Sequence, residues 1–290
     1  MSFVSERAAT LIGFVQRRPA RAAAYAVVGL LAIFLLLAFS ATPRLDRDWV
    51  DNLERMPDIE IEAEGFAMSP VRDWTYDATN DVARDEAAFA ADFGELRNVW
   101  FVIEPHPGLE MMAHTLVLFE FADDRMVGLT IEARKEEGES YSAFWGTFNA
   151  FELAYIWATP KDLLTRRAVY LDHDILVYPL ALSDEQELEF LSRLLRKTQT
   201  ISTKARWYNT LFSNCTNELA KTADLDWHHA FVMTGYSAER LFELGLIPGE
   251  DFAATKARAL MTDEIRTWNE LTPDEFNRAL LVELRARSGD

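Results

Sequence analysis

The chain is poor in cysteine and in basic residues, and each shortage restricts what the protein can be. Cys215 is the only cysteine among 290 residues, so no disulfide can form within the chain. There are 29 lysines and arginines against 47 aspartates and glutamates, which gives a net charge of −18. Proteins that bind nucleic acid need basic surfaces to neutralise phosphates. The composition therefore argues against a nucleic-acid partner and against electrostatic adhesion to anionic lipid.

A long apolar run lies near the N-terminus, over residues 22–41, and it carries no charge. Its length is sufficient to cross a bilayer as one helix. Four arginines and one glutamate precede it, so the positive-inside rule predicts a cytoplasmic basic segment over 1–21 and export of everything after Ala41. A cleaved signal peptide, with a site at Ala38-Phe39-Ser40, is the competing interpretation. We favour a retained anchor because the run is longer than a usual signal core.

The rest of the chain has the size and composition of one large domain with extensions. About 250 residues follow the anchor, and 49% of the whole chain is hydrophobic, which supports a real core. Since the first 41 residues carry +3 of the total of −18, the remainder carries −21. We divide it into a linker and N-terminal extension (42–98), a main domain (99–250) and C-terminal helices (251–290).

The periodicity predicts an α+β fold, with a strand-rich middle flanked by helices. Strand patterns are found over 98–104, 112–121, 126–134, 151–158 and 175–180, with a turn at 122–125. Helices are predicted from the capping box at 183–186, from Asn214, and over 238–244, 251–262 and 273–287. The segments 51–66 and 74–97 show no clear period and are left unassigned.

The local sequence around Cys215 favours a reactive thiol. Ser213 and Asn214 are good helix N-caps, which would place Cys215 in the first helical turn. The positive end of a helix stabilises a thiolate and lowers the pKa of the thiol. The alternative is a small buried side chain, since free cysteine is often buried.

Thiol chemistry needs a base, and His114 is the best candidate because it interrupts an otherwise apolar strand. His106 lies in a proline-rich loop, and His173 lies between two aspartates and is expected in solvent. The adjacent His228 and His229 lack a spaced third ligand, so we predict no metal site and no cofactor. The alternative for His114 is a core histidine with satisfied hydrogen bonds.

Glu132 is the candidate to orient His114, provided that the hairpin register allows it. A two-residue loop would pair His114 with residue 133 and turn Glu132 to the opposite face. An odd loop length, or a bulge at Gly128, would pair His114 with Glu132 at about 5 Å. Glu132 could instead pair with Arg134 or Lys135.

Four motifs occur in order along the chain and together resemble one family, the Lnb N-terminal periplasmic domain. They are Ala-His-Thr-Leu at 113–116, Ile-Glu-Ala-Arg-Lys-Glu-Glu-Gly-Glu-Ser-Tyr-Ser at 131–142, Phe-Glu-Leu-Ala-Tyr at 151–155, and Trp-Tyr-Asn-Thr at 207–210 with Asn-Cys-Thr at 214–216. The resemblance runs from about residue 100 to residue 248. One mild departure is Ser213-Asn214-Cys215-Thr216-Asn217, where the family usually has Asn-Asn-Cys-Thr-Thr.

The resemblance implies a circularly permuted papain-like (NlpC-type) thiol domain on a bacterial inner-membrane protein, with the domain in the periplasm. It implies Cys215 as nucleophile, His114 as base and Glu132 as the orienting residue. The family name comes from lipoprotein N-acyltransferases, which implies acyl transfer through a thioester and a lipid or lipoprotein substrate. A cell-wall amidase or peptidase with the same residues, and a non-catalytic envelope-binding domain, are the two alternatives.

Four further residues are candidates to contact the substrate or to stabilise an oxyanion: Tyr208, Asn214, Arg134 and Tyr141. A hydroxyl from Tyr208 could assist the backbone N–H of Cys215 at an oxyanion. Core packing explains Tyr208 equally well.

Overall fold

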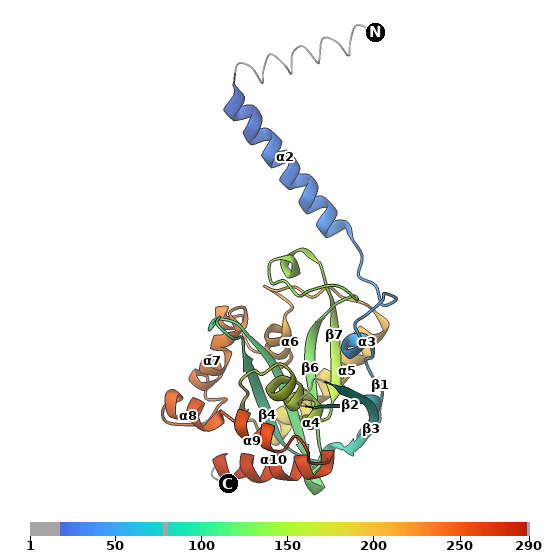
Figure 1. The fold of residues 1–290 in the computed structure, drawn as a ribbon, viewed down its shortest axis with the longest axis vertical. Helices are drawn as coiled ribbons and strands as arrows, with labels where there is room; N and C mark the ends of the chain where they lie inside the picture. The colour runs from blue at the N-terminus through green and yellow to red at the C-terminus, as the bar shows by residue number, and fades with distance from the viewer. Residues whose placement is uncertain (1–17, 78–80, 289–290) are drawn as a thin grey trace.

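The apolar run near the N-terminus forms one long helix, α2 (Pro19–Ser40), in a computed structural model that describes residues 18–77 and 81–288. α2 is long and apolar enough to cross a membrane. It extends away from the rest of the molecule, to which a linker joins it (Figure 1). The predicted spanning segment 22–41 corresponds to α2, whereas most of the predicted cytoplasmic segment 1–21 lies outside the described residues.

The remainder is a mixed α+β structure built around one twisted sheet, so the predicted α+β class is confirmed. The strands are β1 (Asp58–Ile61), β2 (Gly65–Tyr76), β3 (Val82–Asp92), β4 (Leu96–Pro105), β5 (Ala113–Phe121), β6 (Met126–Arg134), β7 (Glu152–Ala158) and β8 (Leu176–Pro179). Their order is β1-β2-β7-β6-β5-β4-β8, and β3 pairs with β2. All pairings are antiparallel except that of β2 with β7.

Helices cover both faces of this sheet (Figure 1). They are α3 (Asp51–Glu54), α4 (Pro160–Thr165), α5 (Asp184–Thr203), α6 (Cys215–Thr222), α7 (Ser237–Glu243), α8 (Phe252–Ala259), α9 (Thr262–Thr267) and α10 (Pro273–Ser288). Leu191 of α5 packs on the face that bears Phe119, and Leu280 of α10 packs on the face that bears Leu118. Each fully buried leucine contributes about 1.5–3 kcal/mol, so the two helices hold the strands from opposite sides.

The β5–β6 hairpin has a three-residue loop, Ala122–Asp124, and this loop length sets the register. The Phe121 backbone N–H donates to the Arg125 carbonyl at 2.8 Å, and Leu116 lies opposite Thr130. The same register places Glu132 opposite His114. The odd loop length considered in the sequence analysis is therefore the one adopted, and no bulge is needed.

The segments left unassigned from sequence contain α3, β1, β3 and the two ends of β2. Among the described strands, β3 pairs only with β2, and most of its residues are exposed. Its sequence therefore lacks the alternation of apolar and polar residues by which a strand is predicted. These strands belong to the predicted N-terminal extension, 42–98, yet they extend the same sheet as β4 to β7.

Candidate functional site

Cys215 begins α6, and its neighbour Asn214 caps that helix, as the local sequence predicts. The Asn214 side-chain oxygen accepts from the Asn217 backbone N–H at 2.7 Å. Its amide donates to the carbonyls of Thr210 and Phe231, each at 2.9 Å. Because both hydrogens of the side-chain amide are used, the Asn214 side chain positions the start of α6 and has no N–H left for a substrate.

His114 and Glu132 face each other across the hairpin. The His114 Nε2 atom lies 3.2 Å from the Glu132 Oε1 atom and 2.6 Å from the Thr130 hydroxyl oxygen. That hydroxyl donates to Glu132 at 2.7 Å, so it accepts the proton of His114 Nε2. This arrangement fixes the tautomer and leaves Nδ1 as the ring nitrogen available to the Cys215 thiol, with which His114 interacts by charge and hydrogen bond.

The site favours a charged thiolate–imidazolium pair at neutral pH. Burial opposes the Cys215 thiolate, but the charge and hydrogen bond of His114, with hydrogen bonds from Thr115, lower the pKa of the thiol to about 7. Burial also opposes the His114 imidazolium, yet the charges of Glu132 and Cys215 raise the pKa of His114 to about 10. About half of the thiol is therefore ionised at pH 7, compared with a few per cent for an ordinary cysteine.

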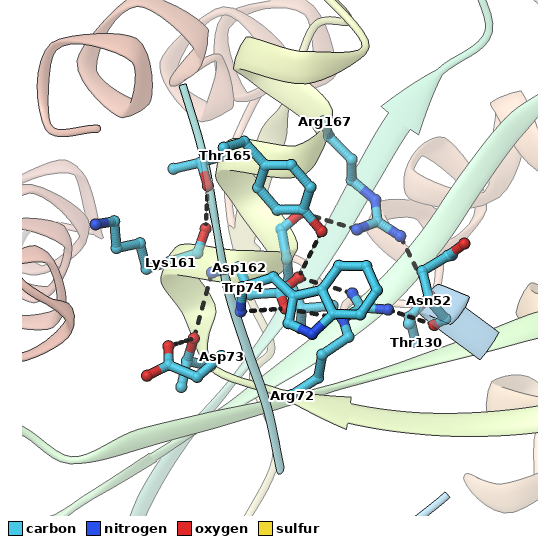
Figure 2. Close-up of polar contacts among 12 residues, drawn as sticks. Asn52, Arg72, Asp73, Trp74, Thr130, Lys161, Asp162, Thr165 and Arg167 are labelled. Carbon is cyan, nitrogen blue, oxygen red and sulfur yellow. Dashed lines mark hydrogen bonds and ion pairs between the residues drawn. The ribbon is translucent and has the colours of Figure 1, made fainter. Parts of the chain in front are cut away.

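The buried side chain of Arg167, which follows α4 in the π-helical turn Arg166–Tyr170, supports Glu132 from behind. Its Nη2 atom lies 3.3 Å from Glu132 Oε1, and its Nε atom lies 2.8 Å from Glu104 Oε2. Burial opposes the charged form of Glu132, but His114 and Arg167 together keep the pKa of Glu132 well below its usual range. Figure 2 shows Arg167 beside Thr130.

Glu104 extends this network to a second histidine. Glu104 lies opposite His114 in the β4–β5 ladder, and its Oε1 atom lies 2.5 Å from the Nδ1 atom of His173. The expectation of a solvated His173 is wrong, because its side chain is only 24% exposed and binds Glu104. Glu104 could have been noticed in the sequence, because it is a carboxylate at the end of the apolar strand 98–104. No pattern in the sequence around Arg167 indicates its role.

These groups open into a cleft of about 370 Å³. Its lining includes Cys215, His114 and Glu132 together with Tyr141 and Tyr208, whose hydroxyls lie 3.2 Å apart. Two predicted contact residues therefore lie at the cleft beside the thiol.

Two cations, Lys135 and Arg166, also line the cleft. In the part of the chain that the structure describes, neither has a carboxylate partner within 4 Å. Most arginines in this acidic protein pair with acids, so these two positions mark the cleft as receptive to a negatively charged group.

The fourth predicted contact residue, Arg134, lies away from the cleft lining. Its Nε atom donates to the Leu53 carbonyl at 2.9 Å, and its Nη2 atom donates to the Glu54 carbonyl. The guanidinium also lies over the Trp49 ring, 4.4 Å from the centroid. Arg134 therefore joins α3 to the end of β6.

No metal-binding cluster of three or more histidine, cysteine, aspartate or glutamate side chains is found within residues 18–77 and 81–288. His228 accepts a hydrogen bond from the Ala230 backbone N–H at 3.2 Å and caps a short helix.

Over residues 18–77 and 81–288, the fold and the site define a mixed α+β domain with a cysteine at a helix N-terminus, preceded by one membrane-length helix. The family model of the Lnb N-terminal periplasmic domain matches residues 84–235, which is more than half of the chain, so the protein belongs to that family. The matched range contains His114, Glu132 and Cys215, and the predicted family is confirmed. No curated protein and no solved structure shows a significant match. Family membership and α2 together fit a periplasmic protein linked to the inner membrane.

Proposed function

We propose that the protein is a membrane-anchored periplasmic thiol enzyme, an acyltransferase or hydrolase that works through a thioester on Cys215. The observation that carries the proposal is the Cys215–His114–Glu132 constellation, opening into a cleft at the N-terminus of α6. A nucleophile, a base beside it and a carboxylate orienting the base are the parts that covalent catalysis of acyl transfer requires.

In the first half-reaction, the Cys215 sulfur attacks the acyl carbonyl carbon of the donor. The electron pair of the carbonyl moves onto its oxygen, where the backbone N–H of Cys215 and the Tyr208 hydroxyl are the available donors. The tetrahedral intermediate then collapses to the thioester. The leaving alcohol or amine departs with a proton from His114 Nδ1, which becomes neutral.

In the second half-reaction, neutral His114 removes a proton from the acceptor, which is an amine for a transferase or water for a hydrolase. The acceptor attacks the thioester carbonyl, and the carbon–sulfur bond breaks to regenerate the thiolate beside a protonated His114. Glu132 stays ionised throughout, because its role is to hold the ring and to balance the charge of the imidazolium.

We further propose that the substrate carries an anionic group that Lys135 and Arg166 bind. Both cations line the cleft that contains the thiol. Phosphate or carboxylate groups fit this chemistry. A phospholipid is favoured over a cell-wall peptide because Trp145 and Phe148 contact Phe34 of α2. These two aromatic residues belong to the same loop as Tyr141, which lines the cleft.

The finer fold and topology assignments belong to the same proposal. His114 and Glu132 on an antiparallel hairpin, followed by Cys215 at a helix start, match the order expected of a permuted papain-like domain. The arginines before α2 support a cytoplasmic N-terminus, a single pass and a periplasmic domain.

The test is transfer of a labelled acyl chain to the protein. The full chain in phospholipid nanodiscs is incubated with a phospholipid bearing an alkyne-tagged acyl chain, and the adduct is mapped by mass spectrometry. We expect a hydroxylamine-sensitive adduct on Cys215, absent in Cys215→Ala and reduced in His114→Ala. His229→Ala is the matched control, because His229 is exposed and does not line the cleft.

Two outcomes would count against the phospholipid proposal. Release of peptides from purified peptidoglycan, dependent on Cys215 and without acyl labelling, would indicate an amidase or peptidase instead. Absence of both activities, with normal folding, would indicate the non-catalytic binding domain.

A further inference from the structure

Two loops form an exposed, uncharged apolar surface beside the mouth of the cleft. Residues 141–151 and 207–217 contain no charged side chain, although 26% of the chain is charged. Four large apolar side chains are exposed on them: Phe144 (62%), Trp145 (50%), Leu211 (40%) and Phe212 (60%). We call these four residues, with Phe148, the apolar rim.

The two loops are joined into one surface by direct contacts. The Thr210 backbone N–H donates to the Gly146 carbonyl at 3.1 Å, and its hydroxyl donates to the Ala143 carbonyl at 2.8 Å. Glycine is required at 146, since an added Cβ would lie 2.5 Å from the Thr210 hydroxyl oxygen. Tyr141 and Thr210 of the same loops line the cleft, so the rim and the site are held in one arrangement.

The rim lies against the membrane-length helix. The ring of Phe34 in α2 lies 6.2 Å from that of Trp145 and 5.3 Å from that of Phe148, and Phe39 lies 6.5 Å from Phe148. Figure 1 shows the loop that precedes β7 at the end of the domain nearest α2. Two members of the apolar rim, Trp145 and Phe148, therefore contact α2 directly.

The depth of this contact can be estimated from the helix rise. Phe34 lies six residues before the last residue of α2, Ser40. At 1.5 Å per residue, it is about 9 Å inside that end of the helix. A helix of this length roughly matches the hydrocarbon thickness of a bilayer. Side chains that touch Phe34 are thus at the level of the outer part of the hydrocarbon layer.

We propose that the apolar rim inserts into the leaflet at the domain side of α2, so that the mouth of the cleft faces lipid. Phenylalanine and leucine gain free energy when buried in acyl chains, and tryptophan favours the membrane interface. The strong negative charge of the domain argues against attraction to anionic lipid as the cause, and the rim itself is uncharged, so we attribute insertion to apolar contact. The catalytic proposal is not needed for this inference.

The experiment measures lipid exposure of single positions in the full chain, in nanodiscs. Cys215→Ser removes the native thiol, and Phe144→Cys or Phe212→Cys then carries an environment-sensitive NBD label. Val282→Cys is the matched control, because Val282 is 68% exposed on α10, at the far end of the domain from α2 (Figure 1). Quenching by doxyl-labelled phosphatidylcholine and by aqueous iodide is compared, and circular dichroism checks each fold.

We expect the Phe144 and Phe212 labels to be quenched at least about threefold more by the doxyl lipid than the Val282 label, and less by iodide. Equal quenching of all three labels by iodide would overturn the proposal. A blue-shifted label that neither quencher reaches would also overturn it, because the rim would then be covered by protein, such as a second copy. Because the background lacks Cys215, failure here is independent of any failure of the acyl-transfer test.

Discussion

Two buried networks of charged side chains lie side by side on α4 and the turn that follows it. They differ in whether any of their polar groups remains accessible to a ligand. In the first, Asp162 of α4 accepts from the Arg72 Nε and Nη2 atoms at 2.8 and 2.7 Å and from the Trp74 backbone N–H at 2.9 Å (Figure 2). Asp162 has no accessible surface. Its acceptors are filled by the protein, so this network ties β2 to α4.

The second network begins five residues later, at Arg167, and runs through Glu132 and His114 to Cys215. Here the last member is a thiol with a pKa near neutrality that lines a cleft. The comparison teaches that burial of charge does not by itself identify a functional site. A closed network stabilises the fold, whereas a network that ends in a titratable nucleophile at a cavity is available for chemistry.

The largest expected effect is on activity, from Cys215→Ala. Loss of the proposed nucleophile should lower acyl transfer by at least about 10⁴-fold, because the sequence contains no other cysteine to replace it. The thermal midpoint should change little, because only one sulfur is removed. Labelled-phospholipid turnover and a thermal melt measure the two effects. A Cys215→Ala protein with undiminished turnover would contradict the assignment.

A complementary effect, on stability, is expected from Asp162→Ala. Arg72 would remain buried without its partner, at a cost of about 3–5 kcal/mol, or about 10 °C in Tm. Glu243→Ala is the control, because its pair with Arg240 is exposed and contributes less than about 1 kcal/mol. Thermal melts followed by near-UV circular dichroism give the comparison, and equal melting of the two variants would refute the closed-network interpretation.

The thiolate pair predicts a specific pH dependence of alkylation. In the wild type, the rate should rise with a midpoint at about pH 7, because the imidazolium of His114 lowers the pKa of Cys215. His114→Ala removes that cation while burial still opposes the thiolate, so the midpoint should move up to pH 8.5 or above. At pH 7 the thiolate fraction, and with it the alkylation rate, would fall by about 16-fold or more. Iodoacetamide labelling across pH 5–10 measures it, and an unchanged profile would show that His114 does not control the thiol.

The smallest expected effect comes from the unpaired cations. Lys135→Ala and Arg166→Ala should each raise the KM for an anionic phospholipid donor about 10-fold, or about 1.4 kcal/mol, near the lower end for a hydrogen bond to a charged group. The kcat should change less, since the role proposed for both cations is to bind the anionic group of the donor and not the reacting carbonyl. Steady-state kinetics with a phospholipid and with an uncharged acyl ester will show whether the two cations bind the anionic group or only support folding. Equal losses on both donors would argue that the cations serve folding alone.

The sequence predicted those parts of the fold and the site that depend on residues adjacent in the chain. The strand over 126–134 was predicted with its observed bounds, and Ser213 and Asn214 were recognised as cap candidates before Cys215, because alternation and capping are set by adjacent residues. The strand β3 was missed because its mostly exposed side chains carry no alternation. Arg134 lies on the strand that bears Glu132, but its contacts with α3 come from a segment 80 residues away in sequence.

The sequence by itself determined the family, the α+β class, the membrane-length helix and a cysteine at the start of a helix, since each follows from motifs, periodicity or neighbouring residues. Only the tertiary structure decided that a three-residue loop sets Glu132 opposite His114, that Arg167 supports this pair, and that the apolar rim meets α2. These contacts join segments far apart in the chain. Their geometry is fixed by packing around the shared sheet, and this packing cannot be predicted from patterns of neighbouring residues.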